Sequence, residues 1–108
     1  MGESVFAGKT IEFKADNGAV YHNIYSADGT TLHYEAVEGL AEGASEEVRL
    51  RTAEVAPGVH MVSWTESSGI TVSQAVNFNA GTIHSFWSRD AGGRRVGELQ
   101  SGSFAVID

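Results

Sequence analysis

Short runs of alternating apolar and polar residues, separated by glycine-containing turns, follow one another along this chain. Turn sequences lie at residues 16–18, 27–29, 57–58, 67–69, 79–81 and 91–93. The runs between them predict strands at residues 10–14, 19–26, 31–37, 46–53, 59–66, 70–78, 82–89 and 94–107, the last broken by Gly97 and Gly102. Turn signals at intervals of about 8–13 residues are typical of all-β sandwiches and barrels.

Eight antiparallel strands joined mostly by tight hairpins favour an up-and-down closed barrel, because closure removes exposed sheet edges. Such a barrel is either filled by its own side chains or able to hold one small ligand. Residues 38–47 are the one passage with helical character, but Gly39 and Gly43 disfavour a helix and predict an acidic loop instead. We expect one domain over residues 1–108, with little helix.

Glu66 lies at the mouth of the turn between the runs 59–66 and 70–78. Counting back by twos gives Trp64, Val62 and His60, so the carboxylate shares a strand face with a large aromatic and a β-branched residue. Two interpretations stay open. Glu66 is a general acid/base in a cavity, where desolvation disfavours its charged form, or it is a strand-end residue that bends out to water.

Composition narrows the classes of partner and compartment. Fourteen acidic residues against seven basic ones give a net charge of −7, which opposes a phosphate backbone, so we expect no nucleic-acid partner. There is no cysteine, hence no disulfide scaffold, and a reducing compartment is the simplest assumption. Residues 1–10 lack the basic flank and apolar run of a signal peptide, and no apolar run approaches the ~20 residues of a membrane helix. We therefore expect a cytoplasmic protein without membrane contact.

Several sequence blocks carry a resemblance to a known family. They are Phe6-x-Gly8, Asp16-Asn17-Gly18-x-x-Tyr21, Thr31-x-x-Tyr34 and Gly58-Val59-x-x-Val62-Ser63-Trp64-Thr65-Glu66-x-x-Gly69-x-x-Val72-Ser73. This order resembles the calycin-type, lipocalin-like barrels of the phenolic acid decarboxylases and their MoaF-like relatives. The resemblance implies that Glu66 matches the decarboxylase acid/base, which protonates the substrate's double bond before CO₂ is lost, and that Tyr21 matches a cavity aromatic.

The chain also departs from the decarboxylases. Their pair of carboxylate-binding tyrosines on the first strand corresponds here to Phe13 and Ala15, and their carboxylate-binding arginine corresponds to the region of Ala44. No arginine occurs between Gly39 and Glu47. Without these donors a substrate carboxylate is not positioned, so we do not expect typical phenolic acid decarboxylation. The remaining pattern resembles the MoaF-like branch.

Other residue patterns give weaker indications. The four histidines lie on separate segments without metal-ligand spacing, and no glycine cluster forms a phosphate loop, so we expect neither a metal nor another cofactor. Arg89 follows Trp87 by two and therefore shares its face. It lies at the cavity rim, within reach of a ligand carboxylate, or it is a surface arginine of the turn region 88–95.

Three functional hypotheses follow. The first is a barrel that binds an apolar or aromatic small molecule, with Glu66 as its fixed polar group and walls drawn from Tyr21, Tyr34, Trp64, Val72 and Phe86 or Trp87, with Arg89 at the rim. The second is a cofactor-free lyase or isomerase in which Glu66 moves a proton on an unsaturated or aromatic substrate. The third is a filled barrel that acts through its surface. The resemblance and the uncharged stretch 102–107 also suggest a homodimer.

Overall fold

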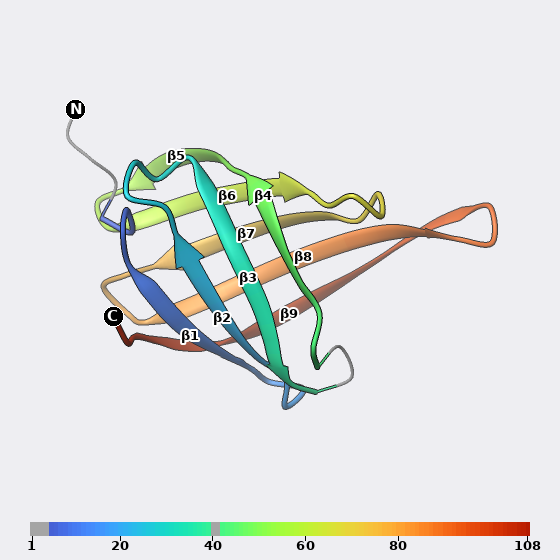
Figure 1. Ribbon diagram of the computed structural model, residues 1–108, viewed down its shortest axis with the longest axis horizontal. Helices are drawn as coiled ribbons and strands as arrows, with labels where there is room; N and C mark the ends of the chain where they lie inside the picture. The colour runs from blue at the N-terminus through green and yellow to red at the C-terminus, as the bar shows by residue number, and fades with distance from the viewer. Residues whose placement is uncertain (1–4, 40–41) are drawn as a thin grey trace.

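The computed structural model describes residues 5–39 and 42–108, and these residues form one antiparallel sheet curled into a nearly closed barrel (Figure 1). The spatial order is β4-β3-β2-β1-β9-β8-β7-β6-β5, and every neighbouring pair is antiparallel. The predicted all-β barrel is confirmed. Its nine strands are β1 Thr10–Ala15, β2 Val20–Tyr25, β3 Thr31–Glu38, β4 Ser45–Arg49, β5 Arg51–Ala56, β6 Val59–Thr65, β7 Thr71–Asn77, β8 Thr82–Ala91 and β9 Arg94–Val106.

The strand number differs from the predicted eight because the run 46–53 bends at Leu50. The chain before the bend pairs with β3 and the chain after it pairs with β6. Leu50 is buried, and its backbone N–H donates to the carbonyl of Thr30, which holds the bend in place. β4 and β5 are therefore the two edges of the sheet, and they meet at this corner.

A polar contact helps to close the barrel near the other end of β4. The Glu46 side chain reaches the turn after β6, where its Oε2 accepts the backbone N–H of Ser67 at 2.9 Å. β4 also lies close to β6 along the barrel wall. The gap between the edge strands β4 and β5 is thus bridged by the Glu46 side chain as well as by the bend at Leu50.

Two other predicted features need correction. The acidic segment 38–47 is not a loop throughout, because β3 extends to Glu38 and β4 begins at Ser45; its residues 40 and 41 lie outside the described part of the chain. Gly97 and Gly102 do not break the last strand either. Both glycines stay in register with β8, because a glycine within a strand still offers its backbone groups to the ladder.

Aromatic side chains fill one end of the barrel. Phe6, fully buried, packs against Tyr25 with ring centroids 4.8 Å apart and against the edge of His60 at 5.3 Å. Phe78 contacts His60 and Phe104, which extends this cluster across the barrel. Because this end is packed, any open space in the barrel lies toward the other end.

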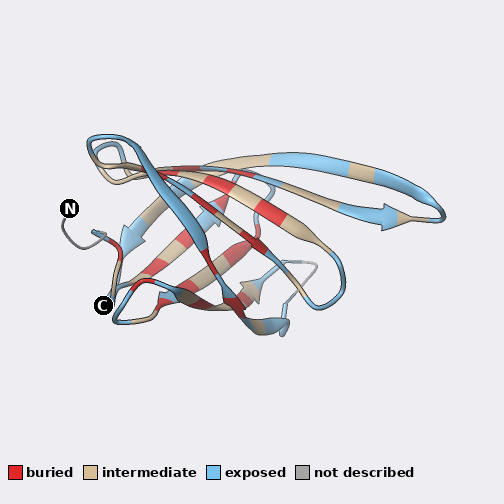
Figure 2. Cartoon of the chain, turned by 90° about the horizontal axis from the view of Figure 1, so that it is seen from above, coloured by how far each residue is buried: buried red, intermediate tan, exposed pale blue. Residues whose placement is uncertain are grey.

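The β8–β9 hairpin extends well beyond the barrel wall (Figure 1). Its projecting part is mostly exposed, whereas buried residues concentrate in the barrel strands (Figure 2). Over residues 5–39 and 42–108, no helix has the length and apolar character needed to cross a membrane.

Candidate functional site

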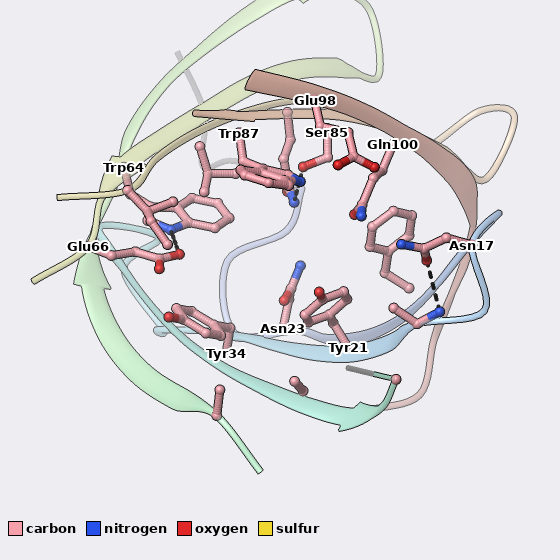
Figure 3. Close-up of a pocket in the computed structure, with 18 of the residues that line it drawn as sticks. Asn17, Tyr21, Asn23, Tyr34, Trp64, Glu66, Ser85, Trp87, Glu98 and Gln100 are labelled. Carbon is pink, nitrogen blue, oxygen red and sulfur yellow. Dashed lines mark hydrogen bonds between the residues drawn. The ribbon is translucent and has the colours of Figure 1, made fainter. Parts of the chain in front are cut away.

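A cavity of about 530 Å³ opens into the barrel opposite the packed aromatic end. This volume lies within the ~300–1,000 Å³ that is usual for small-molecule pockets. Its lining is mainly apolar and aromatic, with polar groups at a few positions (Figure 3). The aromatic members are Phe13, Tyr21, Tyr34, Trp64 and Trp87.

Strand register arranges this lining in rows across the barrel wall. Trp64 on β6 pairs with Val72 on β7, which pairs with Trp87 on β8, and Trp87 pairs with Glu98 on β9. Because every second residue of a strand faces the same side, all four point inward together. The next row toward the packed end is formed in the same way by Val62, Gln74, Ser85 and Gln100.

Glu66 follows the last residue of β6 and begins the Ser-Ser-Gly turn. Its backbone N–H donates to Ile70 O at 2.7 Å, and its carbonyl accepts Gly69 N–H at 2.9 Å. Gly69 has a φ of 93°, a conformation that side chains disfavour, so the glycine permits this tight turn. The half-buried Glu66 side chain lines the cavity, where its Oε2 accepts the indole N–H of Trp64 at 3.1 Å (Figure 3).

Two tyrosines line the cavity opposite the tryptophans. Tyr34 lies parallel to Trp64, with centroids 6.3 Å apart, and Tyr21 lies parallel to Phe13 at 6.2 Å. Burial raises the pKa of Tyr34, and the carboxylates of Glu66 and Glu46 raise it further. Burial likewise raises the pKa of Tyr21, with an added contribution from Glu66. Both phenols therefore stay protonated near neutral pH and remain able to donate a hydrogen bond.

Arg89 lies at the exposed edge of the cavity. Its guanidinium carbon is 5.9 Å from the centroid of the Trp87 ring, a cation–π geometry, and it belongs to the cavity lining. Phe86, which the sequence left as an alternative to Trp87, points the other way and is 48 % exposed. The reason is strand alternation, because adjacent residues of β8 face opposite sides of the sheet.

Sequence reasoning missed the polar residues deep in the cavity. Asn23, Gln74 and Ser85 are all buried and all line the cavity. Gln74 Nε2 donates to Ser85 Oγ at 3.3 Å, whereas Asn23 Nδ2 and Gln74 Oε1 have no hydrogen-bond partner among the residues that the structure describes. The signal was present in the pattern, because Asn23 lies between Tyr21 and Tyr25, and Gln74 between Val72 and Val76, on faces that are otherwise apolar.

The four histidines lie in separate surroundings. His22 contacts Glu12, His33 contacts Glu35 and His84 contacts Ser101, each through a side-chain hydrogen bond, whereas His60 is buried in the aromatic end. In the described part of the chain, no three acidic or histidine side chains gather where they could hold a metal ion.

Comparisons with known proteins identify a family and several similar solved structures. A family model described as MoaF-like matches residues 7–100. A crystal structure from Burkholderia vietnamiensis, described as "a putative beta-lactamase", is similar over 99 % of this chain and 100 % of its own, with a TM-score of 0.89 and 28 % sequence identity. No curated protein matches this chain.

Proposed function

The chain belongs to the MoaF-like family, and from this membership and the cavity we propose that it is a barrel that binds one apolar or aromatic small molecule. The observation that carries the proposal is the cavity of about 530 Å³ walled by Trp64, Trp87, Tyr21 and Tyr34. Aromatic walls with few polar groups are typical of sites for flat organic ligands. The absence of cysteine agrees with binding in the cytoplasm.

The walls offer flat aromatic faces on which a ligand ring can stack. Tyr34 and Trp64 already lie nearly parallel, 25° apart, and offset stacking on such faces adds about 0.5–1.5 kcal/mol per aromatic pair beyond area burial. Arg89 and Glu66 supply charge of both signs at the cavity edge. Such an arrangement favours ligands whose apolar ring enters the barrel while a polar end stays near the mouth.

Filling the cavity tests this proposal. Ala36 is buried and lines the cavity, whereas Ala53 on β5 is exposed and outside it. We expect 2-naphthol to bind the native protein in calorimetric titration and Ala36→Trp to weaken that binding about tenfold or more. Ala53→Trp is the matched control and leaves binding unchanged. Absence of 2-naphthol binding to the native protein contradicts the proposal.

A second candidate function is suggested by the surroundings of Glu66. One carboxylate oxygen is held by the Trp64 indole, and the carboxylate lies beside the protonated phenol of Tyr34. This is a group that can give or take a proton within an apolar cavity, as a cofactor-free lyase or isomerase needs. Phe13 and Ala15 provide no carboxylate clamp, so the substrate in this case is an unsaturated aromatic rather than a typical phenolic acid.

Proton exchange separates binding from catalysis. In D₂O, an active Glu66 would add a deuteron to the terminal vinyl carbon of 4-vinylphenol as the phenol loses its proton, and would then remove a hydrogen from the same carbon. The terminal vinyl hydrogens are thereby exchanged for deuterium, which nuclear magnetic resonance detects. Glu66→Gln should lower the exchange rate by about 10²-fold or more while leaving 2-naphthol bound. If native protein and buffer exchange at the same rate, this second function is rejected and the binding function is left standing.

The name of the structural neighbour is not a guide to this chain. A serine β-lactamase of the common kind uses a nucleophilic serine followed three positions later by lysine. No serine of this sequence has a lysine at that position. We therefore do not extend β-lactam hydrolysis to this chain.

A further inference from the structure

Two buried amide side chains of the cavity have polar atoms without partners. Asn23 is 2 % exposed and Gln74 is 5 % exposed, yet within residues 5–39 and 42–108 Asn23 Nδ2 and Gln74 Oε1 make no hydrogen bond. A buried donor or acceptor left unpaired costs about as much as the desolvation of that group, so native proteins rarely leave two in one place. Both side chains line the cavity, where a bound group could satisfy them.

The two amides belong to different walls of the barrel. Asn23 is on β2, between Ile11 of β1 and Tyr34 of β3 in the strand register. Gln74 is on β7, beside Ser85 of β8. Asn23 and Ser85 project into the cavity from facing walls (Figure 3). Together, Asn23, Gln74 and Ser85 form the polar floor of the cavity, below the aromatic walls.

The hydrogen bonds within the floor determine what it still lacks. Gln74 uses its Nε2 on Ser85 Oγ, so its Oε1 is left to accept. Asn23 has Nδ2 left to donate, because its contact with the neighbouring Tyr25 hydroxyl does not close a hydrogen bond and leaves that hydroxyl unpaired as well. A ligand group that satisfies both amides must therefore accept one hydrogen bond and donate another.

Building on the function proposed above, we infer that the floor binds a neutral group that both accepts and donates a hydrogen bond, carried on a flat ring. An aromatic hydroxyl or the N–H/C=O edge of a lactam has this chemistry. A carboxylate or an ether offers no donor to Gln74 Oε1, and an ammonium offers no acceptor to Asn23 Nδ2. The ring itself stacks among Trp64, Trp87 and Tyr34.

Discrimination by such a floor is strong because a wrong ligand leaves buried groups unpaired. A site built to hydrogen-bond a hydroxyl rejects the analogue that lacks it more sharply than an apolar pocket rejects an extra methylene. One hydroxyl here serves two otherwise unpaired atoms, so loss of its donor should reduce affinity about tenfold or more.

A probe series at neutral pH tests the inference by calorimetry. We expect 2-naphthol and the lactam 2-quinolone to bind at least about tenfold more tightly than 2-methoxynaphthalene and 2-naphthoate. Gln74→Met removes the free acceptor with little change in size, and it should weaken 2-naphthol about tenfold while leaving 2-methoxynaphthalene unchanged or tighter. Asn23→Leu should act likewise, and a thermal melt of each variant shows whether it is folded.

The outcomes separate this inference from the proposed function. One contradicting outcome is equal binding of 2-naphthol and 2-methoxynaphthalene, or an equal loss of both in Gln74→Met. It would mean that the ligand makes no hydrogen bond to the floor amides, which overturns the inference but keeps the binding function. Failure of every probe to bind overturns both.

Discussion

Gly102 lies where β9 passes closest to β1, paired with Ala15, and the replacement Gly102→Ala should strongly destabilise the barrel. A Cβ at this position would overlap the carbonyl oxygen of Lys14 and lie 2.9 Å from Ala15 Cα, where ordinary contacts are 3.4–4 Å. Both obstructing groups are backbone, so no side-chain rotation relieves the overlap. β1 and β9 must separate, which weakens the pairing that joins β1–β4 to the rest of the sheet.

Overpacking costs about 1–3 kcal/mol and occasionally more, and a backbone clash belongs at the upper end of that range. At about 4–8 °C per kcal/mol for a domain of this size, Gly102→Ala should lower Tm by about 12 °C or more. Gly97→Ala on the same strand is the matched control. Its Cβ would meet Phe86 Cζ at 2.5 Å, but Phe86 is 48 % exposed and can turn away. The nearest backbone atom, the carbonyl oxygen of Trp87, is 3.3 Å away, so a shift of a few tenths of an ångström is enough to accommodate the methyl group.

Gly97→Ala should therefore change stability by less than about 1 kcal/mol, because the reduced entropy of the unfolded chain offsets the small repacking. Thermal unfolding followed by circular dichroism measures both variants under one set of conditions. Equal Tm values for Gly97→Ala and Gly102→Ala would show that β1 and β9 do not pack as closely as described here.

Other predictions concern pH, assembly and the tyrosines. Hydrogen bonds from Ser26 and Thr30 lower the pKa of Asp28 from 3.8 to about 2. A carboxyl with a depressed folded-state pKa stabilises above its unfolded value and loses that contribution as pH falls through the folded-state value. In thermal melts, Asp28→Ala should therefore lower Tm at pH 7 and have a much smaller effect at pH 2. The homodimer stays a prediction, and light scattering at high protein concentration should give a mass of twice 11.5 kDa. Exposed Leu99 pairs with exposed Phe86, so Leu99→Lys should shift the mass toward that of the monomer. A monomer mass for the native protein would reject the homodimer. Because Glu66 raises the pKa of Tyr34, Glu66→Gln should lower the pH at which Tyr34 ionises in an ultraviolet titration. An unchanged titration curve would show that Glu66 does not affect the ionisation of Tyr34.

The barrel could be predicted from the sequence because its determinants are local. Turn residues such as Asp16-Asn17-Gly18 and strict alternation between them fix where strands begin and which residues face inward. The bend at Leu50 could not be predicted in this way. It depends on the Thr30 carbonyl and on the meeting of two sheet edges, which are contacts between distant parts of the chain.

The candidate site shows the same division. Alternation from Trp64 predicts that Glu66 shares its face, and the structure has both beside the cavity. Alternation also places Asn23 and Gln74 inward, but an isolated amide within a strand gives no sign of whether it meets a partner. Only the arrangement of β2, β7 and β8 shows that Gln74 has Ser85 as a partner and that two amide atoms have none.

The most direct test of ligand binding in the cavity uses the chain's two tryptophans, Trp64 and Trp87, which both line it. Their indole N–H groups give two signals in a ¹⁵N–¹H correlation spectrum, and Glu66→Gln assigns the one that belongs to Trp64 because that indole donates to Glu66. Titration with 2-naphthol should move both indole signals along a single saturating curve with a one-to-one end point. If both stay fixed while backbone signals of the outward-facing Met61 or Phe86 move, the ligand binds outside the barrel and the account is contradicted.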